Sequence, residues 1–450
     1  MTVDADAEER LDATALLPAA DPADMLRQVA SSAAQVRSAV RATQEADLAE
    51  ITDAGRPRAI VVTGMGGSGV AGDVLAAVCG PGCPAQILPV HDYQLPAWVG
   101  ATDLVIAISC SGGTEETISA AAEAVRRGCR LIGVGGEGSP LAMIAQQARA
   151  PFIGVPSAGM PRSTLWGLSM PLVVIAISCS GGTEETISAA AEAVRRGCRL
   201  IGVGGEGSPL AMIAQQARAP FIGVPSAGMP RSTLWGLSMP LVVIASRLGL
   251  LEAAAADYES AAAELERISH LCRPDSESFV NPAKSLALQL AGTLPMIWAS
   301  SPLAGVAAYR FGTQLSENAK YPAVVGILPE ANHNQVVTFD GPFAAGPGRI
   351  GGALGLDEPG EEGPPVPLRL VLLRDSREHP QVARRREESA QLAAERGIGV
   401  SELAAADGGP LERLASLVQL IDYATVYLAI ALGIDPGPIA AIQELKARIA

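Results

Sequence analysis

A segment of 69 residues occurs twice in tandem in this chain. Residues 105–173 and 174–242 match letter for letter, and the match continues for three further residues, up to Ala245. Solenoid repeats are shorter, come in at least three copies and diverge in sequence, so this pattern indicates a single duplication. One α/β layer cannot hold both copies in equivalent places. We therefore expect one copy's worth of residues to be extruded from the fold.

The flanks of the duplication constrain how the chain is threaded. The residues before copy one and after copy two occur once in the sequence, so each has one position in the fold. Any 69 consecutive residues between them can be the segment that is extruded. We expect copy one to fill the fold, because it follows its own "ATDL" segment without a seam. Without one copy the chain has 450 − 69 = 381 residues, a length that suits two domains.

Short apolar runs alternate with helical stretches along the first half of the chain. The run "RAIVVT" is followed by "AQILPV", "DLVIAIS", "CRLIGVGG" and "APFIGVPS", with helical sequence such as "EETISAAAEAVRRG" between some of them. Continuous apolar strands separated by helices predict a parallel sheet covered on both faces. We expect a first domain over residues 20–250, which opens with an amphipathic helix at 24–51.

A second α/β series follows over residues 275–450. Residues 231–271 read as a helix that bridges the two domains, and residues 411–432 as a long apolar helix. The Gly/Pro-rich stretch 340–367 reads as a surface insertion. The fold class predicted is α/β, with two doubly wound parallel-sheet domains, a bridging helix and the internal duplication.

The composition narrows the class of ligand. The formal net charge is −14, which excludes nucleic acid as a partner because phosphate backbones require a basic face. Small phosphorylated ligands stay open, since backbone N–H groups can bind them. The seven cysteines form no CxxC pair or Cys/His cluster, which predicts no zinc site and a reducing compartment.

No segment reads as a membrane span or a secretory signal. The N-terminal sequence is acidic and lacks an apolar core, and the longest apolar run, 165–177, is interrupted by Gly167, Ser169 and Pro171. Such a run is too short and too broken to cross a bilayer. We therefore expect a cytoplasmic protein without a membrane partner.

A glycine-rich turn, "GMGGSG", follows the first predicted strand. Its glycines allow positive φ angles and close backbone approach, and the N-terminus of the helix that follows attracts an anion. The spacing differs from a dinucleotide-binding fingerprint and lacks the Lys-Ser/Thr of a P-loop. The turn therefore indicates either a phosphate site or simply a tight turn.

A second turn, "SCSGGTEET", places three hydroxyls at the end of another predicted strand. The side chains of Ser109, Ser111 and Thr114 can surround a phosphate without a basic residue. The alternative is that one of them merely caps the following helix. Two such turns at strand ends of one sheet strengthen the phosphate interpretation.

These turns, with "GMPRSTLWG", "QLSENAKYPA" and "PEANHNQVV", resemble the SIS (sugar isomerase) domains of bifunctional phosphoglucose/phosphomannose isomerases of archaea and bacteria. That family carries two SIS domains in one chain. The resemblance covers most of residues 20–450, apart from the repeat and the Gly/Pro-rich insertion. It implies a metal-independent enzyme without a cofactor that interconverts glucose 6-phosphate, mannose 6-phosphate or both with fructose 6-phosphate.

The resemblance also implies roles for individual residues. It assigns substrate phosphate binding to Gly66, Gly67, Ser68, Ser109, Ser111 and Thr114. Arg162 or its duplicate Arg231 would stabilise the enediolate, and Glu317 would move a proton between C1 and C2. His333, from the neighbouring subunit of a homodimer, would assist ring opening. Lys446 matches a catalytic or substrate-binding lysine.

The chemistry of these residue types agrees with such roles. A carboxylate can take a proton from carbon and return it, a guanidinium stabilises enediolate charge, and histidine exchanges protons near neutral pH. By pattern alone, Glu317 could equally be a surface charge and Lys446 an ordinary lysine. Two other functions stay open, namely an amino-sugar phosphate isomerase and a non-catalytic sugar-phosphate-binding protein.

Overall fold

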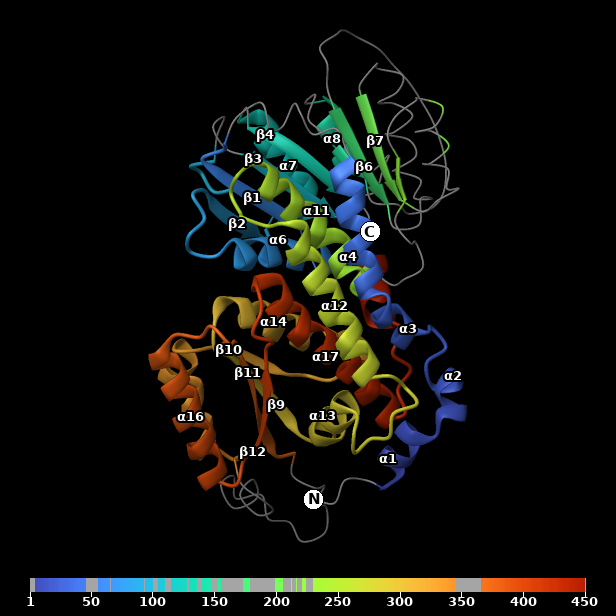
Figure 1. Ribbon diagram of the computed structural model, residues 1–450, viewed down its shortest axis with the longest axis vertical. Helices are drawn as coiled ribbons and strands as arrows, with labels where there is room; N and C mark the ends of the chain where they lie inside the picture. The colour runs from blue at the N-terminus through green and yellow to red at the C-terminus, as the bar shows by residue number, and fades with distance from the viewer. Residues whose placement is uncertain are drawn as a thin grey trace. The chain divides into compact units, whose positions relative to one another are not determined.

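A computed structural model describes most of the chain in two compact units, residues 31–259 and residues 1–30 together with 260–450. Figure 1 shows the elements of both units in chain order. The residues described are 5–45, 56–64, 66–92, 94–99, 104–109, 115–127, 129–135, 140–147, 152–154, 173–178, 199–204, 212, 216, 221–223, 230–344 and 366–449.

The unit of residues 31–259 contains a five-stranded parallel sheet. Its helices are α4 (Ser32–Glu45), α6 (Gly66–Cys79), α7 (Glu115–Arg126), α8 (Pro140–Gln147), α11 (Leu234–Arg247) and the start of α12 (Ala255–Leu271). Its strands are β1 (Ala59–Gly64), β2 (Gln86–Val90), β3 (Leu104–Ser109), β4 (Arg130–Gly135) and β5 (Phe152–Gly154). The order is β2-β1-β3-β4-β5, which confirms the predicted doubly wound α/β arrangement.

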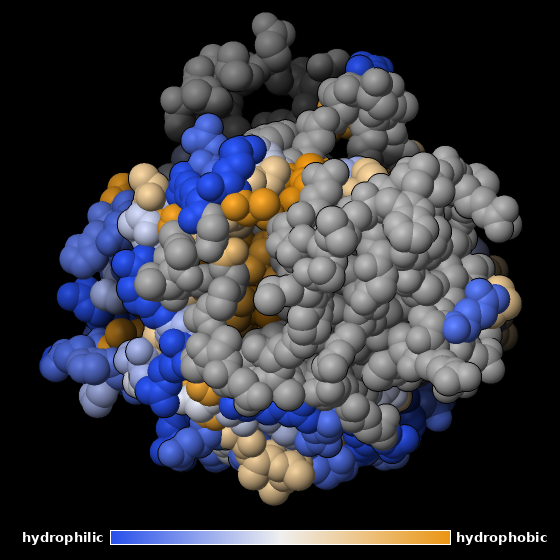
Figure 2. All heavy atoms as spheres, turned by 90° about the horizontal axis from the view of Figure 1, so that it is seen from above, coloured by the Kyte–Doolittle hydropathy of each residue, from blue (hydrophilic) through white to orange (hydrophobic). Residues whose placement is uncertain are grey.

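The central strands of this sheet are buried on both faces. Ile60, Val61 and Val62 on β1 are at most 1% exposed, as expected where helices cover a parallel sheet on both sides. Seen from above, hydrophilic residues predominate among the described residues along the left and lower edges, and some hydrophobic residues are visible near the middle (Figure 2).

Copy two forms a separate three-stranded parallel sheet. Its strands are β6 (Val173–Ser178), β7 (Arg199–Gly204) and β8 (Phe221–Gly223), in the order β6-β7-β8. Copy one supplies β3, β4 and β5 to the main sheet, which is the arrangement we expected for these strands. The two copies therefore have the same strands in the same order, and the copy-one set alone pairs with β1 among the residues described.

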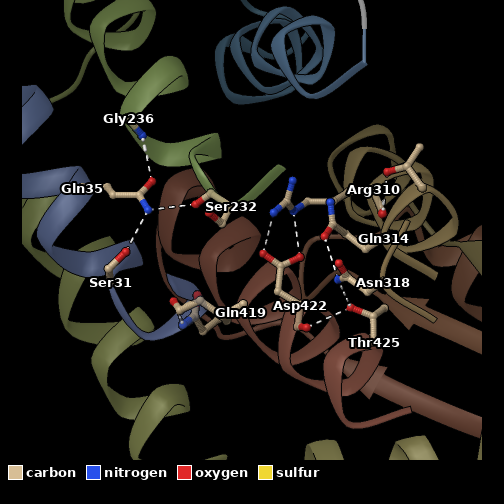
Figure 3. Close-up of polar contacts among 12 residues, drawn as sticks. Ser31, Gln35, Ser232, Gly236, Arg310, Gln314, Asn318, Gln419, Asp422 and Thr425 are labelled. Atoms are coloured by element: carbon tan, nitrogen blue, oxygen red, sulfur yellow. Dashed lines mark hydrogen bonds and ion pairs between the residues drawn. The ribbon is translucent and has the colours of Figure 1, made fainter. Parts of the chain in front are cut away.

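The end of copy two returns to the main body of this unit. The short 3₁₀ helix η2 (Pro230–Ser232) leads into α11, which packs against α4 and α6. Gln35 on α4 donates from Nε2 to the Ser232 carbonyl at 2.8 Å and accepts from the Gly236 N–H at 3.3 Å (Figure 3). The unit is thus assembled from the strands of copy one and the final helix of copy two.

The second unit is built around a four-stranded parallel sheet. Its helices are α1 (Ala5–Asp12), η1 (Thr14–Leu16), α2 (Leu17–Ala20), α3 (Met25–Ala30), most of α12, α13 (Pro282–Leu290), α14 (Pro302–Ala319), η3 (Glu330–His333), η4 (Gln335–Asp340), α16 (Pro380–Glu395), α17 (Pro410–Ala431) and α18 (Ala440–Ile449). Its strands are β9 (Leu294–Ala299), β10 (Val324–Ile327), β11 (Leu368–Arg374) and β12 (Gly399–Ala404), in the order β10-β9-β11-β12. In the core beside the sheet, Trp298 stacks on Phe339 at a centroid distance of 5.5 Å.

The N-terminal thirty residues belong to this second unit, whereas we expected residues 20–30 in the first. Asp12 accepts hydrogen bonds from the Ser278 N–H and from Lys284 Nζ, at 3.0 and 3.1 Å. Arg10 donates to the Ala431 carbonyl at 2.6 Å. Polar contacts from α1 thus hold the start of the chain to α13 and α17.

Two predicted helices are interrupted. The bridging helix expected over 231–271 is divided into α11 and α12, because Gly249 adopts a φ of +66° just after α11 ends. The helix expected over 24–51 is divided at Ser31 into α3 and α4, and residues 46–50 lie outside the described part of the chain. Most of the expected Gly/Pro-rich insertion, residues 345–365, also lies outside it.

Helix α17 is long and apolar enough to cross a membrane by length and composition. However, 94% of its apolar window is buried inside the unit, where α17 packs against α13 and α14. A buried central helix of a folded domain passes the same test, so α17 is the core helix of this unit.

Candidate functional site

The end of β1, the start of α6 and the end of β3 lie at the point where the strand order of the five-stranded sheet reverses. From β1 the chain proceeds through α6 to β2 on one side, and from β3 through α7 to β4 on the other. Gly64, the last residue of β1, pairs with Ile108, so the ends of the two strands are level. Ligands of open α/β sheets bind in the crevice at such a switch point.

The predicted phosphate-binding residues are divided between the described and undescribed parts of this edge. Gly66, Gly67 and Ser68 are the first three residues of α6, where free N–H groups and the helix dipole favour an anion. Ser109 is the last residue of β3. Ser111 and Thr114 lie outside the described residues. The backbone therefore brings the start of α6 and the end of β3 to the same edge of the sheet.

A glycine in the interior of α6 sets how closely this helix approaches the sheet. A Cβ atom at Gly72 would lie 2.9 Å from Cγ1 of Val62 on β1 and 3.5 Å from Cβ of Pro89 on β2. Only a residue without a side chain allows this approach. Gly72 thus fixes where the N-terminus of α6 lies. The glycine-rich turn drew attention in the sequence, but Gly72 did not.

Of the two duplicate arginines, the structure describes only Arg231. It lies in η2, immediately before α11, and is 3% exposed. Arginine is rarely buried unless it is paired. The burial of Arg231 therefore means that its neighbours constrain where the guanidinium lies. Arg162, its duplicate in copy one, lies outside the described residues.

Glu317 lies near the C-terminal end of α14, in the second unit, and is half-buried. A row of polar side chains on the same helix binds α17. Arg310 forms hydrogen bonds of 2.8 and 2.7 Å with Asp422, and Asn318 donates to the Thr425 hydroxyl at 3.0 Å (Figure 3). These contacts fix the rotation of α14, and therefore the direction of the face that carries Glu317.

The lysine of the "SENAK" motif closes the same helix. Lys320 adopts a left-handed φ of 55°, and its Nζ donates to the carbonyls of Glu317, Asn318 and Asp435 at 3.1, 3.1 and 3.0 Å. A positive charge at a helix C-terminus satisfies carbonyls that have no intrahelical partner. The lysine of this motif thus has a structural role at the end of α14, which the sequence did not predict.

His333 is exposed at the end of η3, between two asparagines that bond to the protein. Asn332 donates to the Ser389 hydroxyl at 2.7 Å, and Asn334 accepts from the Gln335 N–H at 2.6 Å. The motif "NHN" therefore holds the two 3₁₀ turns in place while presenting the imidazole outward. Lys446 lies on α18, with its side chain outside the described residues.

The second unit has a switch point of its own, between β9 and β11, and it is occupied by a carboxylate of the chain. Ser301, the N-cap of α14, donates to Asp375 Oδ2 at 2.6 Å, and Arg413 Nε lies 2.8 Å from Asp375 Oδ1. The Asp375 N–H donates to the Ser300 hydroxyl at 2.9 Å. Asp375 is 2% exposed, so its carboxylate stands where an anionic ligand would approach.

Comparison with known proteins shows which families and relatives this chain resembles. Residues 279–449 match the family model "Bacterial phospho-glucose isomerase C-terminal SIS domain". A bifunctional phosphoglucose/phosphomannose isomerase from Caldicellulosiruptor bescii is 27% identical over 391 residues, covering 87% of this chain and 89% of the relative. A D-glucosamine-6-phosphate 4-epimerase from Sulfolobus acidocaldarius is 28% identical over 207 residues, covering 42% of this chain and 63% of the relative.

The fold is also found among solved structures. A hypothetical protein from Thermus thermophilus superposes with a TM-score of 0.58 at 14% identity, over 99% of this chain and 94% of that one. At this identity the likeness concerns the fold alone. The chain is therefore similar to a bifunctional phosphoglucose/phosphomannose isomerase along most of its length, and its residues 279–449 match a model of a C-terminal SIS domain.

Proposed function

We propose that this protein is a sugar-phosphate isomerase that interconverts glucose 6-phosphate, mannose 6-phosphate or both with fructose 6-phosphate. The observation that carries the proposal is the switch point between β1 and β3, where a helix N-terminus meets a strand that ends in serine. The similarity to the Caldicellulosiruptor bescii relative along 87% of the chain supports the same substrate class.

In this proposal the substrate phosphate binds at that crevice. The N–H groups at the start of α6 and the hydroxyls of the two turns neutralise it without a basic residue. The groups assigned to it are Gly66, Gly67, Ser68, Ser109, Ser111 and Thr114.

The proton transfer is assigned to Glu317. Its carboxylate takes the proton from C2 of the open-chain aldose, and the resulting enediolate is stabilised by the guanidinium of Arg231. Return of the proton to C1, with transfer of a hydroxyl proton from O2 to O1, gives the ketose. His333 assists ring opening, and Lys446 binds substrate. This route uses only groups of the chain and requires no metal or cofactor.

We further propose that the protein is a cytoplasmic homodimer. The exposure of His333 on η3 supports a role in a neighbouring subunit, because an imidazole that faces outward is accessible to a second chain. In such a dimer His333 of each chain completes the site of the other.

A second candidate is an enzyme that acts on amino-sugar phosphates, which the similarity to the Sulfolobus acidocaldarius epimerase favours over part of the chain. A third is a protein that binds sugar phosphates without turnover. The presence of both Glu317 and His333 argues against the third, since binding alone requires no proton shuttle.

Coupled assays separate these candidates. The purified protein is incubated with glucose 6-phosphate, mannose 6-phosphate or glucosamine 6-phosphate, and both the fructose 6-phosphate formed and the substrate consumed are measured. The proposal predicts turnover of at least one of the two neutral hexose phosphates. Turnover of glucosamine 6-phosphate alone would favour the second candidate, and calorimetric binding of substrates without turnover would favour the third.

A further inference from the structure

The sheet β6-β7-β8 repeats the pairing of β3-β4-β5 residue by residue. In copy one Val105 pairs with Leu131 and Ser109 with Gly135. In copy two, 69 positions later, Val174 pairs with Leu200 and Ser178 with Gly204. The third strands follow the same rule, since Gly133 pairs with Phe152 and Gly202 with Phe221. The chain therefore contains two equivalent half-sheets.

In the described part of the chain, β1 pairs with the half-sheet of copy one and not with that of copy two. On its other edge β3 pairs with β1, with Val61 opposite Val105 and Val62 opposite Ile106. Among the described residues β6 pairs with β7 alone. Because copy two has the same residues, the edge of β6 fits β1 in the same register. Val174 would then lie opposite Val61.

The two arrangements differ very little in their residues. In either case a length of 69 residues lies outside the five-stranded sheet, so the entropy of closing the loop is the same. The displaced copy can pair with itself, as β6-β7-β8 does here. At the start of the strand, Leu104, which is 3% exposed, is replaced by Val173. One buried methylene favours copy one by roughly fourfold.

We propose that β6 takes the place of β3 beside β1 in a fraction of the molecules, so that Ser178 stands at the switch point in the position of Ser109. The two threadings have sheets of the same strand order and lead into the same helix α11. From the roughly fourfold preference, about one chain in five adopts the β6 threading at equilibrium. The consequence for ligand binding rests on the proposed function, but the strand exchange itself does not.

Interconversion is slow on this account. To exchange, β3 must leave both β1 and β4, which opens the centre of the sheet, so the rate approaches that of unfolding. During synthesis copy one emerges first and can pair with β1 before copy two exists. Refolding the complete chain from denaturant removes this advantage and lets both copies compete.

Disulfide trapping tests the exchange directly. Cysteines in neighbouring strands opposite each other lie within bonding distance. Two matched variants are refolded and briefly oxidised: V61C/V105C, which reports the β3 threading, and V61C/V174C, which reports the β6 threading. Valine to cysteine changes the side-chain volume little. The pairs V62C/I106C and V62C/I175C repeat the test at the next position if the first variants fold poorly.

The expected result is an intrachain disulfide in most molecules of V61C/V105C and in about one fifth of V61C/V174C, located by peptide mass mapping. The absence of an intrachain disulfide in V61C/V174C, while one forms in V61C/V105C, would overturn the proposal. A disulfide found only between chains of V61C/V174C would also overturn it, because the strand would then be exchanged between two molecules.

A binding experiment tests the functional consequence. S109A, S178A and the double variant are refolded, and binding sites for fructose 6-phosphate are counted by calorimetry. The inference predicts two classes of site in S109A, about one fifth with the affinity of the unsubstituted chain and the rest weaker, and only the weaker class in the double variant. Equal loss in S109A and in the double variant would overturn it. If trapping succeeds and no chain binds sugar phosphate, the exchange stands and the proposed function fails.

Discussion

Arg310 on α14 holds Asp422 on α17 through two parallel hydrogen bonds in the interior of the second unit. The Nε contact is 2.8 Å and the Nη2 contact 2.7 Å, and the two side chains are 3% and 5% exposed. A bidentate pair of this kind fixes both distance and orientation. The pair therefore joins the helix that carries Glu317 to the buried helix α17.

The first prediction concerns this ion pair. Asp422→Ala leaves the guanidinium buried without its carboxylate, so we expect a loss of about 3–5 kcal/mol in the free energy of unfolding. In Arg310→Met/Asp422→Leu both charges are removed, and the loss should be about 2 kcal/mol or less. Urea unfolding of both variants measures the difference. Equal losses of unfolding free energy in the two variants would show that the unpaired buried charge does not cause the destabilisation.

The second prediction concerns Asp12, which ties α1 to the second unit. Burial alone raises the pKa of Asp12, but hydrogen bonds from Ser278 and Lys284 outweigh this and hold the pKa below its ordinary value of 3.8. A lowered pKa stabilises the fold above pH 3.8, and the stabilisation is lost as the pH falls through the lowered value.

Asp12→Asn should therefore lower the free energy of unfolding by about 1 kcal/mol at pH 7, and the difference from the unsubstituted chain should shrink as the pH falls below 3.8. Glu8→Gln, which alters an exposed carboxylate of the same helix, is the control. A difference for Asp12→Asn that stays constant from pH 7 to acid would contradict the assigned cause.

The third prediction concerns the approach of α6 to the sheet. Gly72→Ala places a methyl group 2.9 Å from Val62 Cγ1, which should destabilise the fold by about 1–3 kcal/mol. It should also raise KM for the sugar phosphate, because α6 carries the proposed phosphate-binding N-terminus. Gly82→Ala is the matched control, since its Cβ would meet no atom within 4 Å. An unchanged KM in Gly72→Ala would contradict the claim that the position of α6 determines substrate binding.

The fourth prediction concerns the duplication. Deleting residues 105–173 or residues 174–242 gives the same chain of 381 residues (450 − 69), because the two copies are identical. This shorter chain has only one threading, so its Tm should be at least as high as that of the full chain. A Tm lower by more than about 5 °C would mean that the extra half-sheet stabilises the protein.

The sequence predicted the α/β class, because strand periodicity and glycine turns are local signals. The two copies are identical in these signals, so the expectation that copy one fills the sheet depended only on the "ATDL" segment that precedes it. It could not predict every helix boundary. The letters "VVIA" form part of a strand at Val173–Ala176 and part of a helix at Val242–Ala245. Neighbouring strands decide the first and packing against α4 and α6 decides the second, so tertiary context outweighs local preference.

The candidate site was predictable only in part for a similar reason. Ser109 and Ser68 follow recognisable strand and turn patterns, and the structure brings their strand end and helix start to one edge. Gly72 and Lys320 act through contacts with residues distant in sequence or with a helix end. No sequence pattern within a few residues of Gly72 or Lys320 predicts those contacts.

The central claim is that Glu317 moves a carbon-bound proton of a sugar phosphate. The direct measurement is the isomerisation of glucose 6-phosphate and mannose 6-phosphate in D₂O, with kcat and deuterium at C1 and C2 followed by NMR, for the unsubstituted chain, Glu317→Gln and the exposed control Glu388→Gln. We predict turnover with deuterium uptake in the unsubstituted chain and the control, and a kcat lower by about 10²–10⁴-fold in Glu317→Gln. Unchanged kcat in Glu317→Gln would contradict the account.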